Sequence, residues 1–252
     1  MNAEEPGYLV IEDNFPNGRP PLEQAGVFMA DRNTVNLSER MKVTVCLNPI
    51  HTALCTYDCL LGYRLFADGM HDHELDRLAR RLGYDEGLPV VEDPGILSPR
   101  AFLDELMTER FPNAYMGDTS ARIAVDISQM VGIRFGHTIG EYVKRRGSAS
   151  ALVAVPLAIA GWIRYLLAVD DKGQPFELSP DPLLPWLKEQ LSGVRPGDPA
   201  SLKGKLTALL SNSSIFGLNL YEAGLGEKIE GMVAQMLAGP GAVRATLKAW
   251  LD

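Results

Sequence analysis

The longest apolar run of the chain constrains its fold more than any other stretch. Almost every residue from Ala151 to Ile163 is apolar, and Arg164 ends the run. A helix that spans a bilayer needs about 20 apolar residues, so this run is too short to cross a membrane. A helix that is apolar on all sides must instead be surrounded by other elements. We therefore expect a central helix within residues 150–169, with the rest of the chain packed around it.

Helical signals also dominate the sequence from Ser38 onward. Apolar residues recur there at helical spacing, and no convincing strand or internal repeat interrupts them. Besides the central helix, the expected segments are 48–61, 72–82, 99–109, 118–130, 137–146, 183–191, 200–210, 227–237 and 242–250. We expect Asp118 to be the N-cap of the segment that runs to about Met130. The predicted fold is all-α, a multi-helix bundle.

Residues 1–37 differ from the helical part. Tyr8–Ile11 is a short strand-like run, and residues 14–21 form an extended loop rich in proline and glycine. A lone strand has no sheet to join, so we expect it to pair with a partner chain or to be the tail of a preceding element. We divide the chain into an extended arm, residues 1–37, and a helical domain, residues 38–252.

The composition excludes several classes of protein. With 252 residues and 46% hydrophobic composition, the chain can bury a full core. Its net charge of −8 argues against nonspecific binding to nucleic acid or to an anionic membrane. The three cysteines are an odd number without a signal peptide before them, so we expect a reducing, cytoplasmic setting.

Two pairs of metal-ligand residue types do not make a convincing metal site. Cys55 and Cys59 lie four residues apart on the expected helix 48–61, but such cysteines are more often small buried core residues. His71 and His73 are two residues apart at a helix start, so their imidazoles diverge, and no third ligand stands at a fitting spacing. We expect no metal.

A polar cluster lies where the helix 48–61 begins. Asn48-Pro49 is typical of a helix start, with Asn48 as the N-cap, and this places His51 on the first turn. In the ordinary interpretation, Lys42 is a surface lysine, Asn48 a cap and His51 a partly buried histidine. In the alternative, a lysine with a lowered pKa takes a proton from an alcohol. Asn48 and His51 would then donate hydrogen bonds to the developing alkoxide or to a carbonyl.

Arg122 and Asp126 form a second candidate pair. They are four residues apart in the expected helix 118–130, so they either form an ion pair on the helix surface or take part in binding. In the binding alternative, Arg122 clamps a substrate carboxylate or a pair of hydroxyls, which suits a planar guanidinium. The spacing alone leaves both open.

Three ordered segments resemble the C-terminal helical domain of the mannitol dehydrogenase family. They are residues 42–54 with 61–63, residues 122–129 and residues 160–166, and the resemblance covers about residues 1–195. This family of polyol-specific long-chain dehydrogenases includes mannitol 2-dehydrogenase, fructuronate reductase (D-mannonate oxidoreductase) and tagaturonate reductase. Residues 46–54, 86–91 and 93–95 are most similar to the fructuronate reductase branch. The fold implied resembles the 6-phosphogluconate dehydrogenase C-terminal-like domain.

The resemblance implies a metal-independent, NAD-dependent oxidoreductase. It would interconvert a secondary alcohol and a ketone on an open-chain sugar acid or polyol, with D-mannonate and D-fructuronate favoured and mannitol and fructose possible. In the family pattern, Lys42 matches the general base, and Asn48 and His51 match the pair that polarises the reacting oxygen. Arg122 matches a substrate-binding arginine, and we place Asp126 with it as a substrate-binding candidate.

The sequence departs from the family pattern within the site. Lys42 lies six residues before Asn48, whereas many members have a spacing of five. On an unbroken helix Lys42 and His51 would then point in opposite directions, so we expect a π-bulge or a break between Val43 and Asn48. Met130 stands where many members have a substrate-binding lysine, so recognition of the sugar must differ or use another residue.

A further departure concerns the cofactor. The sequence has no GxGxxG and no GxxxxGK[ST] motif, and the nucleotide-binding domain of the family does not precede it. We expect NAD to be bound mainly by that domain, on a missing N-terminal part or a separate chain, and the isolated chain to be inactive. The strand-like arm and the surface that faces that domain would then favour self-association.

A rival hypothesis from another class is a non-catalytic helical module for assembly or ligand sensing that kept the fold. The replacement of a substrate-binding lysine by Met130 and the shifted position of Lys42 would then be early steps in the loss of catalysis. The burial of Lys42 separates the two hypotheses, because a general base is expected in a cleft and a surface lysine in solvent.

Overall fold

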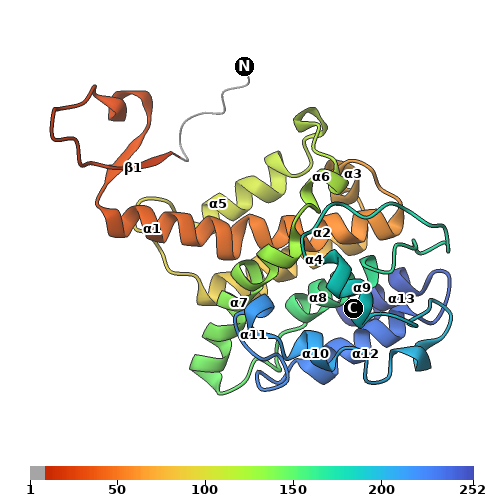
Figure 1. Cartoon of the computed structure of the whole chain (residues 1–252). Helices are drawn as coiled ribbons and strands as arrows, with labels where there is room; N and C mark the ends of the chain where they lie inside the picture. The colour runs from red at the N-terminus through yellow and green to blue at the C-terminus, as the bar shows by residue number, and fades with distance from the viewer. Residues whose placement is uncertain (1–8) are drawn as a thin grey trace.

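The computed structural model describes residues 9–252, which form a bundle of helices with a short arm at the N-terminal end (Figure 1). The predicted all-α class is confirmed. Among these residues, no helix combines the length and the apolar character that crossing a membrane requires. The longer helices are α1 (Arg32–Met41), α2 (Asn48–Leu61), α4 (His73–Arg80), α7 (Ile127–Arg146), α8 (Ala154–Tyr165), α12 (Gly226–Met236) and α13 (Ala242–Leu251).

Shorter helical pieces complete the bundle. The remaining α-helices are α3 (Phe66–Met70), α5 (Pro99–Glu105), α6 (Ser120–Ile123), α9 (Leu184–Gln190), α10 (Thr207–Leu210) and α11 (Ser213–Phe216). The π-helical turns are η2 (Lys42–Cys46), η3 (Arg81–Gly87) and η5 (Leu106–Arg110). The 3₁₀ turns are η1 (Leu22–Ala25), η4 (Leu88–Val90), η6 (Ala114–Met116) and η7 (Pro199–Leu202).

The arm contains two strands. β1 (Val10–Glu12) pairs in parallel with β2 (Phe28–Ala30), with Val10 opposite Phe28. The expectation of a lone strand is therefore wrong, because a three-residue strand is too short to show an alternating pattern in the sequence. Tyr8, where the expected strand begins, lies outside the described residues. α1 begins at Arg32, within the segment that was assigned to the arm. The division of the chain into an arm, residues 1–37, and a helical domain, residues 38–252, stays a prediction.

Helix α8 lies at the centre of the bundle, as its apolar sequence predicts. All of its residues are buried, including Arg164 at 2% exposure. A carboxylate from a distant part of the chain caps its N-terminus. Buried Glu86 accepts hydrogen bonds from the backbone N–H groups of Val153, Ala154 and Val155 at 2.7, 2.8 and 2.9 Å. These N–H groups have no partner within the helix, and a negative charge at this end also complements the helix dipole.

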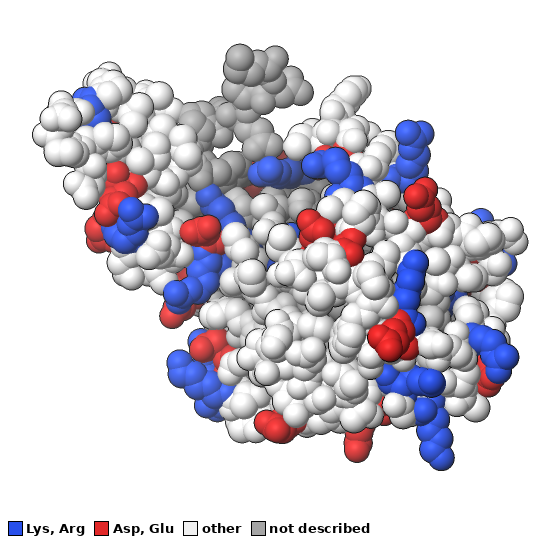
Figure 2. Space-filling view, in the orientation of Figure 1, with Lys and Arg blue, Asp and Glu red and all other residues white. Residues whose placement is uncertain are grey.

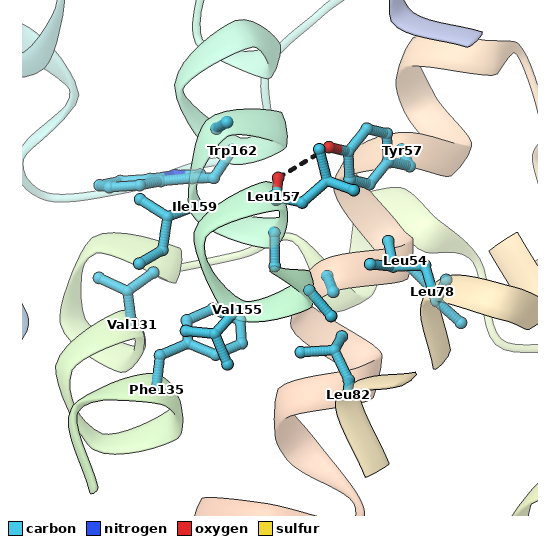
Figure 3. Packing of buried hydrophobic residues seen from close by; sticks show 14 of the residues in the cluster. Leu54, Tyr57, Leu78, Leu82, Val131, Phe135, Val155, Leu157, Ile159 and Trp162 are labelled. Atoms are coloured by element: carbon cyan, nitrogen blue, oxygen red, sulfur yellow. Dashed lines mark hydrogen bonds between the residues drawn. The ribbon is translucent and has the colours of Figure 1, made fainter. Parts of the chain in front are cut away.

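Helix α2 packs closely along α8. The Tyr57 hydroxyl donates a hydrogen bond to the backbone carbonyl of Leu157 at 2.7 Å (Figure 3). The Tyr57 ring fits against α8 because Gly161 has no side chain. A Cβ at position 161 would stand 2.5 Å from two carbon atoms of the ring. On another side of α8, Val131 and Phe135 of α7 face the core (Figure 3). Helix α8 thus lies against α2, α7 and α12, and of these α2 carries Asn48 and His51 of the candidate site.

The expected helix 118–130 is wrong in two respects. Thr119 rather than Asp118 is the N-cap of α6, because the Thr119 hydroxyl accepts the Arg122 N–H at 3.3 Å. The helix also stops at Ile123, because Asp126 adopts a left-handed conformation with φ of 56° and its N–H donates to the Pro180 carbonyl at 2.9 Å.

The division of the later helices also differs from expectation. Segment 137–146 is the second half of α7, which continues unbroken from Ile127. Segment 200–210 is split into η7 and α10 around Gly204, whose φ of 71° is left-handed, and α11 was not expected. Such breaks depend on single backbone angles that an apolar pattern does not record.

Substitution of Gly161 tests the packing of α2 on α8. Gly161→Ala places a methyl group against the buried Tyr57 ring, so we expect a loss of about 1–3 kcal/mol in the free energy of unfolding, as overpacking typically costs. The matched control is Gly231→Ala in α12, where a Cβ meets no atom within 4 Å. That change should stabilise the protein by about 0.5–1 kcal/mol through helix propensity. Urea denaturation measures both, and equal effects of the two changes would contradict this account of the contact.

Candidate functional site

Lys42, Asn48 and His51 lie on the π-helical turn η2 and on helix α2, which follows it. η2 spans Lys42–Cys46 and closes with the Leu47 N–H donating to the Lys42 carbonyl at 3.0 Å. α2 begins immediately afterwards, at Asn48. A π-turn holds one extra residue, which reduces the angle between Lys42 and His51 from about 180° to about 80° around the helix axis. The π-bulge expected from the spacing of Lys42 and Asn48 is confirmed.

Asn48 does not cap α2, contrary to expectation. It is already the first helical residue, and its amide makes no hydrogen bond with another residue in the range 9–252. The preceding turn runs almost directly into α2, where the His51 N–H donates to the Leu47 carbonyl at 3.2 Å. Because backbone groups serve the first turn, the Asn48 amide is not needed as a cap and is available to a ligand.

His51 lies between two aromatic rings and lines a cavity. The centroid of its ring is 4.7 Å from that of Phe66 and 4.9 Å from that of Phe111. The cavity is lined by His51, Leu65, Phe66, Ala67, Arg110, Phe111, Asn113, Ala114, Met116, Gly117 and Asp118. Burial lowers the pKa of His51 to about 4. The imidazole is therefore neutral at pH 7, with one nitrogen as a donor and the other as an acceptor.

Lys42 is partly buried, and its ammonium group lies 5.7 Å from the centroid of the Phe102 ring. Burial, and then the positive charge of Arg110, lower the pKa of Lys42 below its ordinary value of 10.5. A lower pKa leaves a larger fraction of the amine neutral near pH 7, which suits a general base. Lys42 does not line the His51 cavity itself, but the charge of Arg110 acts on both residues.

Arg122 and Asp126 do not pair with each other. Arg122 forms an ion pair with Asp118, one turn earlier, and its side chain is 67% exposed. Asp126 follows the end of α6, so the helical spacing that would bring the two together is lost. Arg122 is connected to the cavity through Asp118, which lines it, whereas Asp126 is not among the lining residues.

A buried carboxyl group holds the Arg122 segment against α2. Asp58 of α2 is fully buried and accepts a hydrogen bond from the Ser120 hydroxyl at 2.6 Å. Burial raises the pKa of Asp58 well above its ordinary value, and its other carboxyl oxygen has no hydrogen-bond partner among residues 9–252. The bond to Ser120 attaches the start of α6, and with it Asp118 and Arg122, to the same helix that carries His51.

Two arginines of the site were not recognised in the sequence. Arg110 lines the His51 cavity, and no local motif marks it, because its relation to His51 is entirely tertiary. Arg134 of α7 is partly buried and donates a hydrogen bond to the Thr52 hydroxyl on the first turns of α2. It lies four residues after Met130 and therefore on the same helix face, which is a signal that the sequence does contain.

The cysteines do not form part of the site. Cys46 and Cys55 are buried and Cys59 is partly buried, and all three are free thiols. Burial raises the pKa of Cys46 and of Cys59 to about 12, so these thiols stay protonated at neutral pH. Within residues 9–252, the structure groups no three His, Cys, Asp or Glu side chains in a way that could hold a metal ion.

Comparison with known proteins identifies the family. Residues 35–237 match the mannitol dehydrogenase C-terminal domain. The chain belongs to the mannitol dehydrogenase family. It is 52% identical over 251 residues to D-mannonate oxidoreductase of Thermotoga maritima, covering 98% of this chain and 46% of that protein. It is 32% identical over 212 residues to D-mannonate oxidoreductase of Escherichia coli, covering 84% and 40%.

Solved structures of family members have the same fold. Mannitol 2-dehydrogenase of Pseudomonas fluorescens, in a ternary complex with NAD and D-mannitol, superposes with a TM-score of 0.75 at 27% identity. The match covers 96% of this chain and 46% of that one. A substrate-free D-sorbitol dehydrogenase superposes with a TM-score of 0.77 at 26% identity, covering 94% and 46%. The chain thus spans slightly less than half the length of these relatives.

The lowered pKa of His51 has a measurable consequence for stability. In the unfolded chain His51 titrates near its ordinary value of 6.5, so between pH 6.5 and about 4 the unfolded state binds more protons than the folded state. Stability is then lost as the pH falls through this window. We expect this loss to be smaller in His51→Gln, measured by urea denaturation at several pH values. Proton NMR checks the cause directly, and a midpoint near 6.5 for His51 in the folded protein would contradict it.

Proposed function

We propose that this chain is the substrate-binding and proton-transferring half of an oxidoreductase that interconverts a secondary alcohol and a ketone. The favoured substrates are D-mannonate and D-fructuronate, and the other candidates are mannitol and fructose. The observation that supports this most is the π-helical turn η2. It turns Lys42, a lysine with a lowered pKa, toward the side of His51 in a chain 52% identical to a D-mannonate oxidoreductase.

The proposed proton transfer uses three side chains of this chain. Oxidation of an alcohol removes a proton from the hydroxyl group and a hydride from the carbon. The neutral amine of Lys42 takes the proton at Nζ. The Asn48 amide and an N–H of the neutral His51 ring donate hydrogen bonds to the oxygen, and so stabilise the negative charge that develops on it. The hydride is transferred from the carbon to an acceptor that is bound outside this chain.

That acceptor is proposed to be NAD, the cofactor in the complex of the Pseudomonas fluorescens relative. The residues of this chain do not fit a dinucleotide, because the sequence has no glycine-rich loop that could cradle its phosphates. We therefore place NAD on a nucleotide-binding domain that is joined to this chain or carried by a separate one. The arm, with Leu9 and Phe15 exposed, is a candidate contact with that domain or with a second copy, and the proposed location is the cytoplasm.

Substrate binding is proposed to involve Arg122 and Asp126, as the family pattern implies. Arg122 is the better supported of the two, because its partner Asp118 lines the His51 cavity. The high exposure of Arg122 and the presence of Met130 favour the rival hypothesis, a non-catalytic helical module. The partial burial of Lys42 and the contacts of His51 favour the enzyme.

The decisive experiment is an activity assay of this chain together with the nucleotide-binding domain, whether that domain is joined to it or carried by a separate chain. We expect NADH-dependent reduction of fructuronate, and a decrease in kcat of about 100-fold or more in Lys42→Ala, as for loss of a general base. The control is Lys203→Ala at an exposed position, which should keep full activity. A folded protein without activity on fructuronate, tagaturonate or fructose would support the non-catalytic module. Full activity of Lys42→Ala would exclude Lys42 as the base.

A further inference from the structure

The charges of three arginines reach His51 in a chain that is negatively charged overall. The charges of Arg110, Arg122 and Arg134 all act on the His51 ring in the same direction, and Asp118 acts in the opposite direction. The chain as a whole carries a net charge of −8. In Figure 2, Lys and Arg side chains lie along the side of the bundle next to the arm, with Asp and Glu side chains among them. A local excess of positive charge beside a cavity favours an anionic ligand.

The three arginines differ in how they are related to the cavity. Arg122 is paired with Asp118 and is largely exposed. Arg134 donates to the Thr52 hydroxyl and so is held against α2. Arg110 is the member of this group that lines the cavity, together with His51 and Asn113. Of the three, it is therefore the one placed to touch a ligand that also touches His51.

The position of Arg110 relative to His51 is well defined. Arg110 is the last residue of the π-helical turn η5, which closes with the Phe111 N–H donating to the Leu106 carbonyl at 2.8 Å. Phe111 is buried at 2% exposure, and its ring packs against both His51 and Phe66. The backbone of Arg110 is therefore fixed beside the cavity, so that binding a ligand has to order only its side chain.

We infer that Arg110 recognises the acid group of the ligand, and that it sets a preference for sugar acids over neutral polyols. This inference rests on the proposed function for the class of ligand. A guanidinium group can donate two parallel hydrogen bonds to a carboxylate, which no neutral polyol can accept in the same way. The charge of Arg110 also reaches Lys42, so an acid group bound there lies near both residues that would handle the reacting oxygen.

Ligand binding to the chain itself tests the inference. Sodium D-mannonate and D-mannitol are titrated into the wild type and Arg110→Gln, followed by NMR. We expect Arg110→Gln to weaken D-mannonate binding by about 10- to 100-fold, as for loss of a charge-assisted hydrogen bond, and D-mannitol binding by less than about 2-fold. The matched control is Arg195→Gln, at a side chain that is 74% exposed and paired with Asp198, which should change neither affinity.

Several outcomes would overturn the inference. In the first, the wild type binds D-mannonate no more tightly than D-mannitol. In the second, Arg110→Gln weakens the binding of both ligands equally, or of neither. In the third, inorganic phosphate competes for the site as well as D-mannonate does. The last would indicate a general anion site.

Turnover by this chain together with the nucleotide-binding domain separates this inference from the proposed function. Arg110→Gln should raise KM for fructuronate about 10-fold or more while KM for fructose stays unchanged, whereas Lys42→Ala acts on kcat. Arg110→Lys, which keeps the charge without the planar fork, should recover part of the lost affinity. A protein without turnover that still prefers D-mannonate through Arg110 would refute the oxidoreductase proposal and leave the acid-binding role of Arg110 intact.

Discussion

The close contact between α2 and α8 determines where the candidate site lies. Tyr57 occupies the space that Gly161 leaves and bonds to the backbone of α8 one turn away, which holds α2 along the buried central helix. Helix α8 is itself held at its N-terminus by Glu86. The first turn of α2, with Asn48 and His51, is therefore attached to the most deeply buried part of the molecule. This part of the site is thus anchored to the core of the molecule.

The π-helical turn η2 adds the lysine to this arrangement. The chain from α1 to α2 is almost one continuous helix, and one extra residue within it rotates Lys42 toward the His51 side. The family pattern requires Lys42 and His51 to converge, and this requirement predicted the turn, because a straight helix would separate these two side chains by half a turn. The central helix was equally predictable, since a helix without a polar face is stable only when other elements surround it.

Features that depend on one backbone angle or on tertiary contacts could not be predicted. The left-handed Asp126 ends α6 and removes the expected pairing with Arg122. Asn48 has a typical capping sequence, but the preceding turn already supplies the backbone bonds that a cap would make. Arg110 is almost sixty residues from His51, and only the folded chain brings them to one cavity. A helical pattern defines which faces are buried, but it does not show which distant charges meet there.

The Glu86 cap also affects the order in which the chain can fold. Glu86 lies 67 residues before Val153, the first N–H group that it binds. During synthesis the carboxylate is therefore already present when α8 emerges, and the central helix can be capped at once. Helix α12, which packs against α8, follows about 60 residues later. Until it arrives, one apolar side of α8 stays uncovered, so a growing or truncated chain that lacks α12 and α13 is the form most exposed to aggregation.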